Sequence, residues 1–299
     1  MKVARQFERR GPLWVPRYQP VFPQPVPSYG PKPPGGGPRR QPPLERFERW
    51  RRRFRCAWTH YSGAGNYGTS SVGSFTLTLG FTPPAGSLLV ALAAGYYTSS
   101  GTYTISISDN SSGPADSWSS ITSAGSWASG NHSPFQAFAC NVTSGTAPTT
   151  VTATYSSNTN YPVLVVDCYT GGPNPFVQDG SGVTAYGDST SPSASLTTGS
   201  AANDLLWSGM TTYGSATTVS VGSPFTLETQ GGGNRYNSAD DGITNSTAAS
   251  TQYTASWTLS SSLYWCEVLV GFKAACAAED DSWLVSRPQG GDSPVTVWE

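Results

Sequence analysis

Hydrophobic residues stand at every second position from Phe75 to Phe81, with Thr or Gly between them. Alternation with a period of two places one face of a strand in a core and the other in solvent, so it predicts a β-strand. Turn residues follow at 83–86, and an apolar run follows at 88–97. The same reasoning predicts further strands at 103–108, 135–141, 149–155 and 163–169. Short strands separated by turns, with no helical stretch between them, predict an all-β fold, an antiparallel β-sandwich of jelly-roll-like kind.

Composition agrees with this prediction. Charged residues make up 12% of the 299 residues, against roughly 25% in an average soluble protein. Glycine is abundant, with 33 residues. This is a composition of strands joined by turns rather than of helices.

A weak internal repeat organises the region from 57 to 274. Ser87-Leu-Leu-Val90 corresponds to Asp204-Leu-Leu-Trp207, and three later segments correspond in the same order: 104–108 with 218–221, 151–155 with 253–257, and 163–171 with 265–271. The repeat predicts one sandwich of two related halves, about 57–175 and 185–274, with Phe176 to Ser195 as the crossover. Two small tandem sandwiches are the alternative.

The N-terminal segment differs sharply in charge from the rest. Between Lys2 and Arg55 there are 14 basic and 3 acidic residues, a net +11, whereas the remainder carries 3 basic and 15 acidic residues, a net −12. Residues 11–43 hold 12 of the 24 prolines, which predicts an extended, disordered arm over 1–43. A basic arm beside an acidic body indicates an anionic partner, whether nucleic acid, a membrane surface or a neighbouring subunit. A solubilising tail is the alternative.

A short basic amphipathic helix is predicted at 44–56, because Leu44, Phe47, Trp50 and Phe54 fall at helical spacing. A helix of this length is unstable alone in water, so it needs a surface to form against. The alternatives are a partner surface and the chain's own sandwich. The residues expected to anchor the arm are Phe47, Trp50, Arg51, Arg52, Arg53 and Phe54. Residues 275–299 form an acidic C-terminal tail.

Neither end of the chain carries an obvious membrane or export signal. The basic start is followed by prolines rather than by an apolar stretch, which argues against a secretion signal. The longest apolar run, Leu88 to Tyr97, is too short to span a bilayer. The expected location is a virion or an extracellular surface, reached by release on lysis.

Three stretches carry a resemblance: TPPAGSLLVAL at 82–92, TISISDNSSG at 104–113 and NVTSGTAPTTVTATYSSNTNYPVLVVDCYTG at 141–171. They resemble the repetitive, jelly-roll-like β-sandwich domains of phage virion proteins and bacterial surface proteins. The resemblance covers about two thirds of the chain and leaves out the N-terminal arm. It implies a structural, adhesive or glycan-contacting role.

Aromatic residues are the main candidates for a binding site. Trp118 and Trp127 lie in Ser- and Gly-rich stretches, and Tyr96 and Tyr97 end the apolar run. Exposed rings stack on the apolar face of a sugar, and Asp167 is a candidate to bind a sugar hydroxyl. The alternative is that the tryptophans close the ends of the sandwich core.

Catalytic chemistry finds little support in the sequence. Asp167 and Glu267 lie in the strands that close the two halves, and two carboxylates in one cleft would suit glycoside hydrolysis. The favoured alternative is a structural carboxylate held by neighbouring backbone or by Arg235. No familiar hydrolase or nucleotide-binding motif occurs, so we expect no enzyme activity.

No cofactor is expected. Asp109 to Gly113 and Asp240-Asp241 offer oxygen ligands for a structural calcium ion, but the same residues are ordinary in tight turns. Cys140, Cys168 and Cys266 lie in apolar strands, where a thiol acts as a small hydrophobe.

The sequence therefore predicts a non-enzymatic structural or attachment protein, anchored through its arm to other subunits of a particle. The alternatives are a carbohydrate-binding module and a jelly-roll shell protein whose basic arm binds nucleic acid.

Overall fold

The computed structural model describes residues 6–10, 13–17, 58–97, 103–111, 117–127, 133–143, 147–199, 204–214, 218–231, 235–240 and 247–274. The chain divides into two units, Met1–Phe47 and Glu48–Glu299. The predicted helix at 44–56, with all six anchoring residues, and the tail at 275–299 lie outside the described residues.

Within the first unit, β1 (Gln6–Arg10) pairs antiparallel with β2 (Leu13–Arg17). Residues 13–17 belong to the proline-rich segment for which the sequence predicts an extended arm. Pro16 lies opposite Phe7 in this pair. Both strands of a two-stranded sheet are edges, where proline is tolerated because one side of each strand needs no backbone donor.

The first half of the second unit contains eight strands, which pair into two sheets that share β10: β3 (Thr59–Tyr67), β4 (Val72–Thr78), β5 (Leu88–Tyr96), β6 (Ile105–Asp109), β7 (Ser119–Ser120), β8 (Gly125–Trp127), β9 (Ser133–Asn141) and β10 (Thr150–Thr170). The start of β10 pairs with β4 and β6. Its end, from residue 160, pairs with β3 and β5, and β5 pairs in turn with β9.

The second half repeats this topology with eight further strands: β11 (Val183–Ser189), β12 (Ser193–Thr197), β13 (Leu205–Tyr213), β14 (Val219–Val221), β15 (Thr226–Gly231), β16 (Tyr236–Asp240), β17 (Gln252–Leu259) and β18 (Leu263–Phe272). One sheet has the order β11-β18-β13-β16-β15 and the other has the order β12-β17-β14. The two halves have the same strand pairing, except that the single long strand β10 of the first half corresponds to two strands, β17 and β18, in the second.

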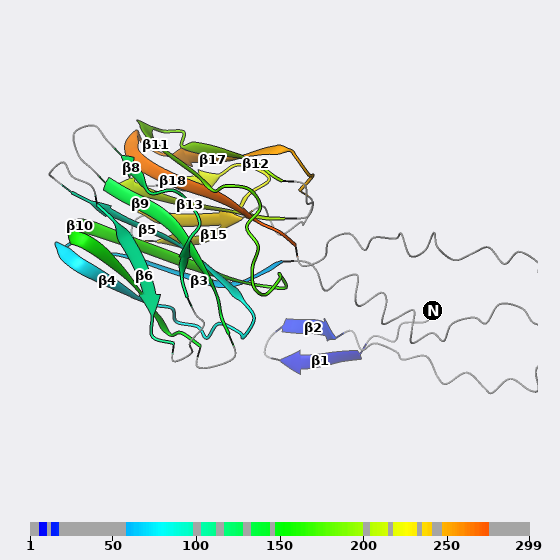
Figure 1. The fold of residues 1–299 in the computed structure, drawn as a ribbon. Coiled ribbons are helices and arrows are strands. Elements are labelled where there is room, and N and C mark those ends of the chain that lie inside the picture. The colour runs from blue at the N-terminus through cyan, green and yellow to red at the C-terminus, as the bar shows by residue number, and fades with distance from the viewer. Residues whose placement is uncertain are drawn as a thin grey trace, which may run out of the picture. The chain divides into compact units, whose positions relative to one another are not determined.

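Three hydrophobic cores show how the sheets are layered. One core lies inside each half, between its two sheets. The third, which we call the central core, joins residues of β5, β9 and β10 to residues of β13 and β18. The two halves therefore pack through their larger sheets. Figure 1 shows β4 and β6 on one side of this stack, β12 and β17 on the other, and β5, β9, β13 and β18 between them.

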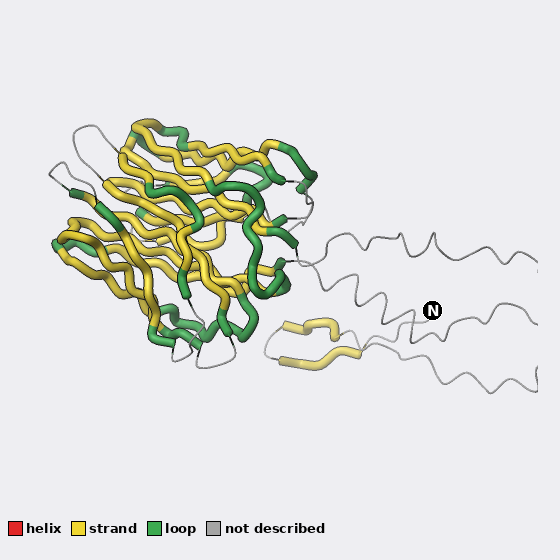
Figure 2. Tube along the Cα trace, in the orientation of Figure 1, coloured by secondary structure: helices red, strands yellow, loops and turns green. Residues whose placement is uncertain are grey.

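The burial pattern along each strand reflects whether the strand lies in a middle or an outer sheet of the stack. β5 and β13 are buried along almost their whole length, because a sheet in the middle of the stack has cores on both faces. β12 and β17 alternate between buried and exposed residues, as outer strands with one solvent face do. Figure 2 shows that the described residues are strands and connecting loops throughout.

The prediction of an all-β structure of antiparallel, sandwich-like sheets is confirmed. Each half has its own core between two sheets, which corresponds to the alternative of two tandem sandwiches rather than to one sandwich. The structure differs from the prediction in two further places. The segments at 149–155 and 163–169 form one continuous strand, β10, whose partners change near Tyr161. The crossover predicted at 176–195 contains a strand, β11, which pairs with the edge of β18. Its exposed edge position explains why its sequence lacks an apolar pattern. Among the residues that the structure describes, no helix is long and apolar enough to cross a membrane.

Candidate ligand-binding site

A cleft opens between the two halves, beside the central core. It encloses about 480 Å³ of empty space, open solvent at its mouth included. Aromatic rings are prominent in its lining, to which these described residues contribute: Tyr67, Ala94, Gly95, Tyr96, Ser133, Tyr161, Val163, Thr211, Thr212, Tyr213, Arg235, Tyr264, Trp265 and Cys266. Because the volume includes open solvent, the enclosed part suits a single ring of a ligand rather than a long chain.

The internal repeat builds the floor of this cleft. Tyr96 ends β5 and Tyr213 ends β13 at the equivalent position, and the two rings stack with centroids 4.5 Å apart at 26°. In the ladders of the two larger sheets Tyr213 pairs with Tyr264, whereas Tyr96 pairs with Asn160, next to Tyr161 and at an irregularity of the register. The tyrosines thus meet because the two halves pack through the same face.

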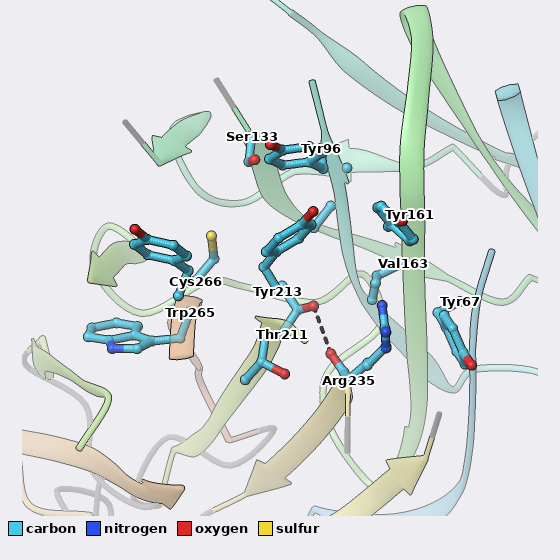
Figure 3. Close-up of a pocket in the computed structure, with 14 residues that line it drawn as sticks. Tyr67, Tyr96, Ser133, Tyr161, Val163, Thr211, Tyr213, Arg235, Trp265 and Cys266 are labelled. Atoms are coloured by element: carbon cyan, nitrogen blue, oxygen red, sulfur yellow. Dashed lines mark hydrogen bonds between the residues drawn. The ribbon is translucent and has the colours of Figure 1, made fainter. Parts of the chain in front are cut away.

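Arg235 lies at the wall of the cleft, directly before β16. Its carbonyl oxygen accepts a hydrogen bond from Thr211 Oγ1 at 2.8 Å and another from the backbone N–H of Thr212 at 3.1 Å (Figure 3). Its guanidinium carbon lies 5.0 Å from the ring centroid of Tyr67 and 5.6 Å from that of Tyr161. Both distances are within the range of cation–π attraction, so the guanidinium interacts with both rings.

Of the sequence-predicted binding residues, Tyr96 lies in the cleft. Tyr97 is buried, donates a hydrogen bond to the carbonyl oxygen of Ser157 and stacks on Tyr103, so the prediction that it contacts a glycan is wrong. Trp118 packs against the core of the first half and donates its indole N–H to Asp109 Oδ2 at 2.8 Å. It closes the end of that core, as the alternative had it.

Trp127 ends β8 and pairs with Ser133, which lines the cleft, while the side chain of Trp127 lies outside the described part.

Three residues of the cleft were not predicted from the sequence as binding residues: Tyr161, Tyr213 and Arg235. Extending the repeat from Ser87-Leu-Leu-Val90 and Asp204-Leu-Leu-Trp207 by six residues aligns Tyr96 with Tyr213, so that signal was available.

Asp167 is not a glycan ligand, because it is completely buried in the contact between the halves. Its carboxylate accepts hydrogen bonds from the indole N–H of Trp207 and from Thr229 Oγ1, each at 2.7 Å. Both donors belong to the second half. His60 Nε2 lies 3.4 Å from Asp167 Oδ1. Asp167 therefore ties β10 to the opposite sheet, and Arg235 is not its partner.

His60 bridges this carboxylate to another from the second half. Its Nδ1 lies 2.7 Å from Glu228 Oε2. Burial acts to lower the pKa of His60, but the hydrogen bond to Asp167 and the charges of Asp167, Glu228 and Asp240 outweigh it, so the pKa is raised. The imidazolium is thereby favoured between two carboxylates. We call Asp167, His60 and Glu228 the inter-half clasp.

Replacing Asp167 with Ala should weaken folding by about 3–5 kcal/mol, because the donors of Trp207 and Thr229 and the charge of His60 lose their buried partner. Asp188→Ala is the matched control, since Asp188 is exposed and accepts one hydrogen bond, from Ser262; it should change stability by less than about 1 kcal/mol. Urea unfolding measures both. Equal losses in the two variants would contradict the clasp.

Glu267 does not share a cleft with Asp167, so the two carboxylates do not form the pair that glycoside hydrolysis would need. Adjacent residues of a strand point to opposite faces of the sheet. Glu267 lies on the face of β18 that packs against the core of the second half. There its Oε1 accepts hydrogen bonds from Ser208 Oγ at 2.9 Å and from the indole N–H of Trp257 at 3.0 Å. Burial raises the pKa of Glu267 to about 8, although these two hydrogen bonds act to lower it.

The protonation of Glu267 predicts a pH-dependent stability. The carboxyl ionises near pH 4.5 in the unfolded chain and near pH 8 in the folded one, so folding holds a proton between these values. The folded state should lose stability progressively as the pH rises from about 4.5 to about 8, by on the order of a few kcal/mol in all, with the loss complete above the folded pKa. Glu267→Gln cannot ionise, so its stability should fall less between pH 5 and pH 9 than that of the parent chain. Thermal or urea unfolding across this range measures the difference; parallel pH profiles would refute the protonated state.

The candidate calcium ligands Asp109 and Asn110 accept hydrogen bonds from backbone N–H groups instead. Asp109 Oδ1 accepts the backbone N–H of Ser111, and Asn110 Oδ1 accepts those of Thr149 and Thr150. Asp240 is buried in β16, and Asp241 lies outside the described residues. Within the described ranges, no group of three or more His, Cys, Asp or Glu residues is arranged to hold a metal ion. Cys140, Cys168 and Cys266 are buried in the strands, as predicted.

The fold and the cleft together define an all-β protein of stacked antiparallel sheets with an aromatic cleft between two repeats. The chain matches no family model, no curated protein and no solved structure in comparisons with known proteins.

Proposed function

We propose that this chain is a non-enzymatic attachment protein, whose double sandwich binds carbohydrate in the tyrosine-lined cleft and whose basic arm fixes it to a particle. The observation that carries the proposal is the cleft, where Tyr96, Tyr161 and Tyr213 form one aromatic surface. The resemblance to virion and bacterial surface domains points in the same direction.

The chemistry of the cleft suits a sugar better than a purely apolar ligand. Tyrosine offers a ring that stacks on the C–H face of a sugar and a hydroxyl that bonds to its oxygens. Tyr161 and Tyr213 are 36% and 39% exposed, so both rings are open to a ligand. The surface is rigid, because Tyr213 contacts the rings of both Tyr96 and Tyr161.

Binding without hydrolysis is supported by the carboxylates. Asp167 and Glu267 face different cores and hydrogen-bond to protein groups. Neither lines the cleft. A hydrolase of the common kind needs two carboxyl groups on either side of the scissile bond.

The arm supports attachment to a larger assembly. The segment from Lys2 to Arg55, which comprises the arm and the predicted helix, has a net charge of +11, close in size to the −12 of the remaining chain. Opposite charges on two parts of one chain favour contact between the arm of one copy and the body of another. Its interspersed prolines and aromatic residues favour docking on protein over the alternative of binding packaged nucleic acid.

Tyr213→Ala should weaken glycan binding at least tenfold, because it removes the ring that contacts both Tyr96 and Tyr161. Tyr186→Ala is the matched control, since Tyr186 is 53% exposed and lies outside the cleft lining. Screening the full chain on a glycan array and titrating the best ligand measures both. Equal effects of the two substitutions would exclude the cleft as the site.

Removal of residues 1–56 should abolish co-sedimentation of the chain with particles from its source, as followed by mass spectrometry of density-gradient fractions. Replacing Arg51, Arg52 and Arg53 with Gln should weaken it in part, because the charge falls while the rest of the arm remains. Nuclease treatment separates the alternatives: loss of co-sedimentation after digestion would indicate nucleic-acid binding. A chain found free of particles would contradict the attachment role and leave a carbohydrate-binding module.

A further inference from the structure

We propose that the cleft selects a sugar that carries an N-acetyl group, whose methyl contacts small residues beside the central core and whose amide hydrogen-bonds to Ser133. The inference rests on the proposed carbohydrate-binding function and adds the class of ligand.

The lining of the cleft changes from aromatic rings beside solvent to small side chains beside the core. Each strand end that brings a tyrosine to the cleft also brings a smaller lining residue two positions away: Ala94 with Tyr96, Val163 with Tyr161, Thr211 with Tyr213, and Cys266 with Tyr264. The four tyrosines are half-buried or exposed, and the four smaller residues are buried. We call these four smaller residues the inner lining.

The inner lining is largely apolar and carries no charge. Ala94 pairs with Val163 in one larger sheet, and Thr211 pairs with Cys266 in the other, so each half supplies one pair. The hydroxyl of Thr211 already donates to a backbone carbonyl oxygen. Burial raises the pKa of the Cys266 thiol, which therefore stays neutral. Such a surface favours contact with a small apolar group over contact with a hydroxyl or an ion.

Ser133 is a polar residue of the cleft lining whose hydroxyl has no partner. It begins β9 and is 8% exposed, and its Oγ makes no hydrogen bond within the part of the chain that the structure describes. Phe135, two residues further along β9, lies opposite Ala94, so Ser133 shares the face of that pair. Figure 3 shows Ser133 beside Tyr96. A buried hydroxyl without a partner is unfavourable, and a ligand can bond to it without displacing a bond within the protein.

An N-acetyl group supplies both an apolar and a polar contact within a small space. Its methyl suits the inner lining, and the adjoining amide has an N–H donor and a carbonyl acceptor, either of which a serine hydroxyl can bind. A sugar hydroxyl in the same place would lose water against Ala94, Val163 and Cys266. The methyl of a deoxy sugar would suit the inner lining but leave Ser133 without a partner. The ring that carries the acetamido group can stack on Tyr161 or Tyr213.

The test uses the full chain and methyl glycosides as probes: N-acetylglucosamine with glucose, N-acetylgalactosamine with galactose, and fucose, whose methyl has no amide. In at least one of the two pairs the N-acetyl sugar should bind about tenfold more tightly than its parent hexose and than fucose, because one apolar group in a fitted pocket has an effect of this size. NMR titration measures each affinity. Saturation-transfer NMR should show that the acetyl methyl protons receive the strongest transfer from the protein.

Two variants assign the preference to named residues. Ser133→Ala should reduce the preference for the N-acetyl sugar several-fold and leave binding of the parent hexose unchanged. It should not lower the melting temperature without ligand, because the hydroxyl has no partner to lose. Ala94→Val, which fills part of the inner lining, should reduce the same preference. Ser193→Ala is the matched control, since Ser193 is exposed on β12 outside the cleft lining. Thermal unfolding verifies that each variant is folded.

The outcomes separate this inference from the function on which it rests. Equal affinities for the N-acetyl sugars and their parent hexoses would overturn the N-acetyl preference and leave carbohydrate binding intact. Fucose binding as tightly as the N-acetyl sugars would overturn the contribution of the amide. A preference that Ser133→Ala leaves unchanged would overturn the role of this hydroxyl. Binding of no sugar, either here or on the glycan array, by a folded chain would overturn both proposals.

Discussion

The structure depends on the packing of two equivalent sheets against each other. Each half is a small sandwich with its own core, and each presents a second apolar face that would be exposed if the half stood alone. The same strands of both halves supply that face, so the contact resembles a two-fold dimer contained in one chain. The burial of β5 and β13 on both faces follows from this arrangement. It also explains why these strands are nearly continuous apolar runs, whereas the outer strands alternate.

The central core is not purely apolar, and its polar part gives the contact specificity. Asp167 is inserted among hydrophobic neighbours, where a carboxylate is unfavourable unless it is fully hydrogen-bonded. Trp207 and Thr229 meet this need from the opposite sheet. Gly63 permits the approach, because a Cβ there would overlap Thr229 Oγ1 and Asp167 Oδ1. A shift of one sheet over the other would leave the carboxylate without hydrogen-bond partners. The clasp therefore fixes the relative position of the two sheets, which contacts between apolar side chains alone would not specify.

Much of the fold could be predicted from sequence because strand patterns are local. The alternation at 75–81, the turn at Gly86 with its positive φ of 82°, and the repeat after Ser87 and Asp204 were all readable. β3 and β11 escaped prediction, since edge strands rich in Gly, Ser and Thr carry no apolar pattern.

The site was less predictable, because it forms only when the halves meet. Alternation along β10 places Asp167 on one face with Val165 and Tyr169, and these two neighbours lie in the central core. What covers the face comes from residues 40 and 62 positions away, Trp207 and Thr229. A pattern along one strand cannot indicate such distant partners.

Duplication alone would produce a symmetric cleft, and the sequence shows how this one became one-sided. Tyr96 has its equivalent in Tyr213, and Tyr161 and Tyr264 add one further ring from each half, so both halves contribute to the aromatic floor. The two halves differ in the residues that they place at the wall of the cleft. Phe135 and Tyr236 hold equivalent positions opposite β5 and β13, so the residues before them, Pro134 and Arg235, are equivalent too. Proline has no charge and no donor, whereas arginine has both. The two halves therefore place different residues at equivalent positions beside the cleft, a proline in one and an arginine in the other, and the cleft is asymmetric although the strands around it repeat.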